Sequence, residues 1–127
     1  MKKTHKHLLY HWLPLLCYCL FIFIQSAQPL TDLIPRRPML DKLLHVLAYF
    51  ILAILFFRAY RSLLIKTSQP VLIWISISSS ILYGISDEIH QHFVPMRQSD
   101  AMDVLADALG SVIGVWVYCR WGKKLGF

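Results

Sequence analysis

The chain has 127 residues, of which 57% are hydrophobic and only 16% are charged. Soluble domains carry about 25% charged and about 45–50% apolar residues, so this composition argues against a soluble globular domain. A formal charge of +6 could point to nucleic acid, but the basic residues stand beside long apolar blocks. We therefore expect a membrane protein with no nucleic-acid partner.

The apolar residues are gathered in four blocks, which charges and prolines separate. The blocks are Leu8–Ile24, Leu43–Phe57, Val71–Ile85 and Val104–Cys119. A helix needs roughly 20 residues to cross a hydrocarbon core of about 30 Å, so each membrane span must take in some neighbouring polar residues. The sequence predicts an all-α fold, with residues 1–127 forming one integral membrane domain built as a four-helix transmembrane bundle.

Caps and prolines predict the limits of the four helices. The first is expected over about 8–26; a cleaved signal peptide is the alternative there, although the apolar stretch is longer than signal peptides usually have. The second covers about 41–60 with Asp41 as N-cap. The third covers about 70–91 and begins at Pro70, where the missing N–H does no harm. The fourth covers about 100–120, capped by Ser99 or Asp100.

The basic residues predict the orientation. Most of them fall at one side of the predicted bundle: Lys2, Lys3, Lys6, Arg58, Arg61, Lys66, Arg120, Lys123 and Lys124. Fewer fall at the other side, namely Arg36, Arg37, Lys42 and Arg97. Because basic residues prefer the inner side, we expect a multi-pass protein of the cell membrane with both termini in the cytoplasm.

The acids are expected at the outer side. Counting about 20 residues from the basic ends of the last three helices places six of the seven acids at one level: Asp41, Asp87, Glu88, Asp100, Asp103 and Asp107. Spacings of three, four and seven residues put them and their polar neighbours on single helical stripes, in the sets Lys42–His45–Tyr49, Asp87–Gln91 and Asp100–Asp103–Asp107. A charge at the bilayer centre costs about 2.5–3.5 kcal/mol, so the acids should face inward, around a polar pocket open to the outside. Polar contacts that only hold helices together are the alternative.

Three segments resemble the VanZ-like family of small membrane proteins: "DKLLHVLAYF", "YGISDEIHQHFVPMRQSD" and "DVLADALGSVIG". The resemblance covers about residues 41–114. It implies, position by position, that the motif residues are Lys42, His45, Asp87, Glu88, Gln91, Arg97, Asp103 and Gly110. One departure is Asp107, where the family usually has asparagine. The resemblance implies a plasma-membrane protein, and the family's namesake is associated with resistance to the glycopeptide antibiotic teicoplanin.

Our leading hypothesis is a pocket that binds a cell-envelope ligand, the head group of a lipid or a glycan. Its ligand-binding residues would be Lys42, His45, Asp87, Glu88, Gln91, Arg97, Asp103 and Asp107. Lys42 and Arg97 would hold an anionic group, and Asp87, Glu88 and Gln91 would orient it.

Two other hypotheses stay open. In the first, the protein is an intramembrane metal-dependent hydrolase of an envelope lipid, with a divalent cation gathered by Asp87, Glu88, His45 and Asp103. No HExxH or comparable signature supports it, so the sequence assigns no metal ligand, catalytic residue or cofactor. In the second, the protein is a scaffold or an assembly subunit, whose acids could be exchanged for Asn and Gln with little functional loss. A homo-oligomer also stays open.

Overall fold

The computed structural model of the protein describes residues 2–27, 38–63, 66–94, 100–122 and 124. This part of the chain contains four α-helices and no strand. The helices are α1 (Lys2–Ala27), α2 (Pro38–Leu63), α3 (Gln69–His92) and α4 (Ala101–Trp121). The predicted all-α, four-helix architecture is confirmed.

Two of the predicted helix starts are confirmed and one is wrong. Asp100 is the N-cap of α4 and its side chain accepts a hydrogen bond from the Met102 N–H over 2.9 Å. Pro70 lies in the first turn of α3. Asp41 is not the N-cap of α2, because that helix already begins at Pro38. The Asp41 carboxylate lies in the first turn, where a negative charge interacts favourably with the helix dipole.

Each of the four helices is long and apolar enough to cross a membrane. Large apolar side chains cover the outside of the bundle, among them Trp74, Leu82 and Leu105. Several polar side chains are instead buried inside it, including Ser76 and Ser80. An apolar exterior around a partly polar interior suits hydrocarbon as the solvent, and the chain is a membrane-spanning protein.

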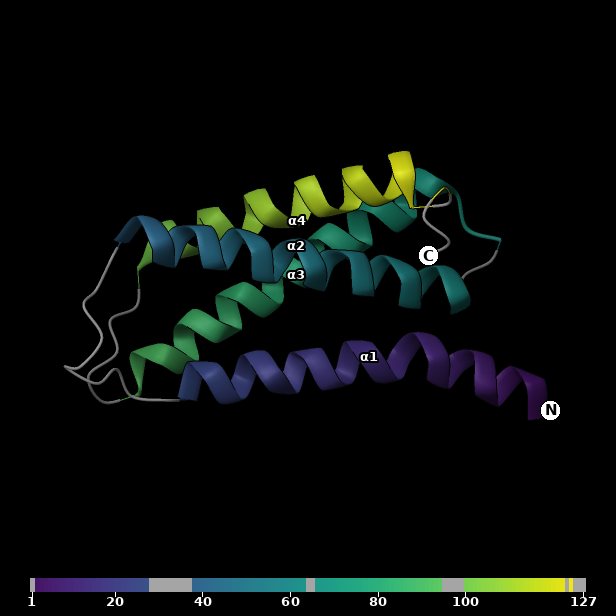
Figure 1. Cartoon of the computed structure of the whole chain (residues 1–127), viewed down its shortest axis with the longest axis horizontal. Helices are drawn as coiled ribbons and strands as arrows, with labels where there is room; N and C mark the ends of the chain where they lie inside the picture. Colours follow the sequence, from purple (N-terminus) through teal and green to yellow (C-terminus); the bar gives the residue numbers. More distant parts are fainter. Residues whose placement is uncertain (1, 28–37, 64–65, 95–99, 123, 125–127) are drawn as a thin grey trace.

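Figure 1 shows how the helices are arranged. The beginning of α1 and the end of α4 lie at one end of the bundle, the right end in this view. At the left end lie the end of α1, the beginning of α2, the end of α3 and the beginning of α4. We call the left end the acidic end, because the buried acids of α3 and α4 lie there.

Helices α2 and α4 run in the same direction and pack closely, with two glycines at the contact. A Cβ atom at Gly110 would meet the carbonyl of Val46, and a Cβ atom at Gly114 would meet the carbonyl of Phe50. Within a membrane, small residues let two helix backbones approach in this way. This close approach brings the beginnings of α2 and α4 together at the acidic end.

Candidate functional site

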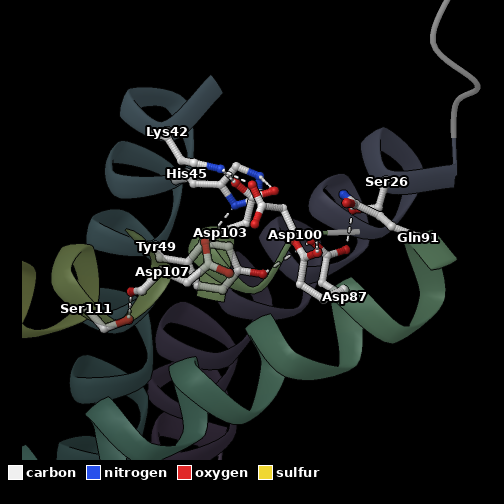
Figure 2. Close-up of polar contacts among 12 residues, drawn as sticks. Ser26, Lys42, His45, Tyr49, Asp87, Gln91, Asp100, Asp103, Asp107 and Ser111 are labelled. Carbon is white, nitrogen blue, oxygen red and sulfur yellow. Dashed lines mark hydrogen bonds and ion pairs between the residues drawn. The ribbon is translucent and has the colours of Figure 1, made fainter. Parts of the chain in front are cut away.

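The outermost contact of the acidic end joins the first turns of α2 and α4. The Lys42 ammonium lies 2.8 Å from Asp100 Oδ2 and 2.6 Å from Asp103 Oδ1. Lys42 is partly exposed, whereas Asp103 is buried. One cation thus offsets two acids of the predicted α4 stripe (Figure 2).

Asp100 lies outside the membrane-spanning segments, and the hydrogen bond from Lys42 is the main cause of its altered titration. Together with the backbone N–H of Met102, it holds the pKa of the Asp100 carboxyl below its ordinary value. The carboxylate therefore stays ionised at neutral pH. It both caps α4 and pairs with α2.

One turn further into the bundle, His45 of α2 meets Asp107 of α4. His45 Nδ1 lies 2.7 Å from Asp107 Oδ1, and His45 Nε2 lies 3.8 Å from Asp103 Oδ2. The ring also stacks on Tyr49, the next residue of the α2 stripe. Asp107 is completely buried.

Residues of α3 and α4 surround Asp107. Ser111 donates to the Asp107 carbonyl over 2.7 Å and also pairs with Ser80 of α3 over 2.7 Å. Gly84 of α3 faces the side chain, and a Cβ atom there would lie only 2.7 Å from Asp107 Oδ2. Three helices therefore position one acid.

A second group of contacts joins α3 to α1 and α2. Ser26, near the end of α1, donates a hydrogen bond to Asp87 Oδ1, and Gln91 Nε2 donates to Ser26 over 3.3 Å. The Tyr49 hydroxyl donates to Asp87 Oδ2 over 3.5 Å. Figure 2 shows these residues beside the His45 and Asp107 pair. Asp87 and Gln91 lie on one face of α3, as expected, and both contact Ser26.

Glu88, next to Asp87, points to α4 instead of α1. Its Oε2 accepts from the Asp100 N–H over 3.0 Å. Glu88 Oε1 and Asp107 Oδ2 are both buried and have no hydrogen-bond partner among the described residues. A buried carboxylate oxygen without a partner is costly in free energy while the carboxylate stays ionised.

Two cavities flank the acids. The first, of about 390 Å³, lies between α1, α2 and α3; its polar lining includes Ser26, His45, Tyr49, Asp87 and Gln91. Its apolar lining comes from Phe21, Ile22, Leu44 and Ala48. We call it the α1–α3 pocket. The second cavity, of about 360 Å³, lies between α3 and α4 and is lined in part by Glu88, His92 and Asp100.

The structure brings together seven of the eight residues predicted for the site: Lys42, His45, Asp87, Glu88, Gln91, Asp103 and Asp107. The eighth, Arg97, lies outside the described residues. Lys42 does not line the α1–α3 pocket, and its ammonium already has two carboxylate partners.

The contribution of α1 was not predicted from the sequence. The pocket was expected among the last three helices, but Ser26 of α1 contacts Asp87 and Gln91. The available signal was weak: Gln25 and Ser26 are the polar residues that follow the first apolar block. Tyr49 was placed on the correct stripe but not in the site.

The donors that could hold a metal ion also differ from the expected set. One donor atom from each of His45, Glu88 and Asp107 lies within 4.8 Å of the others. Asp87 and Asp103, which were expected to take part, are directed to Ser26 and to Lys42.

The comparison with protein families identifies the family of the chain. The model of the VanZ/LLP1 family matches residues 9–122, nearly the whole chain. The match takes in most of α1, the whole of α2, α3 and α4, and every residue of the site. No curated protein and no solved structure gives a significant match to the chain.

Proposed function

The chain belongs to the VanZ/LLP1 family, and we propose that this member binds the polar head group of an envelope lipid or glycan in its α1–α3 pocket. One observation carries the proposal: the pocket is lined both by apolar side chains and by buried hydrogen-bonding groups. This combination suits a molecule with an acyl chain and a polar head, because ligand sites are mostly apolar with a few placed polar groups.

The polar lining favours a head group that donates hydrogen bonds. The two Asp87 oxygens accept from Ser26 and Tyr49, and each has a second lone pair for another donor. Gln91, Ser26 and Tyr49 can adjust to hydroxyl groups. Lys42 is held by Asp100 and Asp103, so it offers little to an anion. We therefore propose a sugar or another polyol as the head group, in place of the anionic group expected from the sequence.

We propose that the pocket opens on the external side of the cell membrane. The supporting observation is the distribution of basic residues: Arg58 and Arg61 on α2 and Arg120 on α4 lie at the end opposite the acids. Because basic residues prefer the cytoplasmic side, both termini would be cytoplasmic. A reporter fused to the carboxyl terminus that is active only outside the cell should stay inactive; activity there would contradict this orientation.

Lipid retention tests the binding proposal. The purified chain is incubated with equal amounts of monoglucosyldiacylglycerol and phosphatidylglycerol, and retained lipid is measured by native mass spectrometry. We expect the wild type to retain the glucolipid preferentially. Asp87→Asn should lower retention at least about tenfold, because a hydrogen bond to a charged acceptor contributes about 1.5–3 kcal/mol.

The matched control is Ser78→Ala, because Ser78 is an exposed position of the same helix, away from the pocket. Retention in this variant should equal that of the wild type. Equal retention of the two lipids by the wild type, or full glucolipid retention by Asp87→Asn, would contradict the proposal.

Hydrolysis of an envelope lipid is the second candidate function. The observation that favours it is the pair of buried carboxylate oxygens, on Glu88 and Asp107, without hydrogen-bond partners among the described residues. Glu88 lines the cavity between α3 and α4, and a carboxylate of this kind could accept a proton there from an attacking water. Release of the head group from the same glucolipid, lost in Glu88→Gln, would establish it; retention without release would leave binding alone.

A contribution to glycopeptide resistance is the most specific part of the proposal. It comes from the family resemblance. Its test is the teicoplanin sensitivity of a deletion strain that carries either the wild-type gene or Glu88→Gln. We expect only the wild type to restore the resistance of the parent strain. Equal sensitivity of the deletion and parent strains would remove this part and leave lipid binding untouched.

A further inference from the structure

Three donor atoms from three different helices meet at the acidic end. His45 belongs to α2, Glu88 to α3 and Asp107 to α4, and one ligand atom of each lies within 4.8 Å of the other two. Donors bound at about 2.0–2.2 Å to one ion stand about 3–3.6 Å apart. Small side-chain rotations would therefore bring the three donors onto a single ion.

The free oxygens of this group point to a ligand. Glu88 Oε1 and Asp107 Oδ2 have no hydrogen-bond partner within the described residues, although Glu88 is 7% exposed and Asp107 is 0% exposed. The other oxygens of these carboxylates are already used, Glu88 Oε2 by the Asp100 N–H and Asp107 Oδ1 by His45. Each acid is thus held in place and keeps one oxygen available.

The charges around the group leave a negative excess. Lys42, the nearest lysine in the described structure, is bound to Asp100 and Asp103. A proton on His45 could offset only one of the two acids of the group, Glu88 and Asp107. Two buried carboxylates repel each other unless a cation or a proton intervenes, and one divalent cation would offset both.

We propose that His45, Glu88 and Asp107 bind a divalent metal ion of the Mn²⁺ or Zn²⁺ class. The imidazole nitrogen decides the class, because Ca²⁺ takes six to eight oxygen ligands and Mg²⁺ is also bound through oxygen. Mixed nitrogen and oxygen donors suit transition metals. This inference does not rest on lipid binding, because Glu88 and Asp107 do not line the α1–α3 pocket.

The ion would have two routes of entry. His45 lines the α1–α3 pocket, and Glu88 lines the cavity between α3 and α4. The metal would thus lie between the two cavities. An ion reached from the α1–α3 pocket through His45 would be placed beside a bound head group, where it could polarise a water molecule.

Manganese binding to the full chain tests the inference. The protein is reconstituted in nanodiscs of phosphatidylcholine, stripped with a chelator and titrated with Mn²⁺, while the spectrum of free Mn²⁺ is followed by electron paramagnetic resonance. We expect one Mn²⁺ per chain, displaced by Zn²⁺. Glu88→Gln and Asp107→Asn should each lower the affinity at least about tenfold, which is the smallest loss seen even for outer partners of metal ligands.

The control is Asp100→Asn, which removes a neighbouring acid that is paired with Lys42 and leaves the three donors in place. It should bind Mn²⁺ as the wild type does. Circular dichroism checks the folding of each variant, and Glu88→Gln carries the test if Asp107→Asn does not fold. Absence of saturable binding in the wild type, or equal binding in Glu88→Gln, would overturn the inference. Glucolipid retention is measured on the same preparations, so a failure of the metal site is distinguished from a failure of the pocket.

Discussion

Helices α2 and α4 meet along two stretches that differ in kind. In the middle of the bundle, Gly110 and Gly114 place α4 directly against the carbonyls of Val46 and Phe50. At the acidic end, the same two helices meet through charged side chains, with Lys42 and His45 facing the acids of α4. The first stretch is backbone against backbone, and the second is side chain against side chain.

The difference teaches how a small membrane protein can bury acids. Apolar side chains gain little from leaving lipid for another helix, so close backbone packing has to supply the association. Once Gly110 and Gly114 hold the pair together, the first turns of α2 and α4 are positioned without help from the acids. Polar groups at the acidic end can then remain without hydrogen-bond partners. Within the described part of the chain, one oxygen of Glu88 and one of Asp107 are such groups.

Gly110→Ala should have the largest effect on stability. Its methyl group would collide with the Val46 carbonyl, which is backbone and cannot rotate away. Overpacking of this kind costs about 1–3 kcal/mol or more. Thermal unfolding in detergent should show the loss. Val112→Ala, on the exposed face of the same helix, is the control and should unfold close to the wild type; equal unfolding of both variants would mean that the glycine contact does not hold the bundle.

Lys42→Met should have the next largest effect. The substitution leaves the buried Asp103 carboxylate without its ammonium partner. Because Lys42 is partly exposed, we expect about 1–2 kcal/mol, less than the loss from breaking a fully buried pair. Lys42→Arg keeps the charge and should retain most of the stability. Unfolding of Lys42→Met at the wild-type temperature would mean that the charged contact between α2 and α4 does not stabilise the fold.

Gly84→Ala should separate packing from chemistry. Its methyl group would lie 2.7 Å from Asp107 Oδ2, which can rotate, and 3.2 Å from Asp107 Cβ and Tyr49 Cε1. We therefore expect about 1 kcal/mol of lost stability, at the low end of the range for overpacking. The rotation would move Asp107 away from His45, and Mn²⁺ affinity should fall with it. Titration of Mn²⁺ and thermal unfolding on one preparation measure both effects. A variant with normal affinity would show that the position of Asp107 does not matter for the site.

Asp100→Asn should have the smallest effect, and that effect should depend on pH. The pKa of Asp100 is lowered in the folded state, so its contribution is present above the unfolded pKa of about 3.9 and is lost as the pH falls through the folded value. Asparagine caps a helix about as well as aspartate does, so the cap is kept. We expect the variant to unfold slightly earlier than the wild type at pH 7, and the difference to shrink steadily as the pH falls below about 3.9. A gap that persists unchanged at the lower pH would contradict the role of Lys42 as the cause.

The number and type of the elements could be predicted from the sequence because lipid imposes a simple rule. Each apolar block such as Val71–Ile85 had to be a helix, since only a helix satisfies its backbone within the membrane. That the acid side chains face the inside of the bundle could also be predicted, because a charge facing hydrocarbon is costly. The stripe of Lys42, His45 and Tyr49 and the stripe of Asp103 and Asp107 do face each other in the structure.

The assignment of partners could not be predicted, because it depends on how the helices are rotated and where they cross. Asp87 and Glu88 are neighbours in sequence, yet one faces Ser26 of α1 and the other the beginning of α4. Nothing in the first apolar block marks Ser26 as a partner of α3. The start of α2 was also misplaced, since Pro38 can begin a helix as well as Asp41 can cap one.

The most direct test of the account is an experimental structure of the chain crystallised in a lipid phase that contains monoglucosyldiacylglycerol. The account predicts density for a head group in the α1–α3 pocket, within hydrogen-bonding distance of Asp87 and Gln91. An acyl chain alone in that pocket, or Asp87 and Asp107 turned outward to the hydrocarbon, would contradict it.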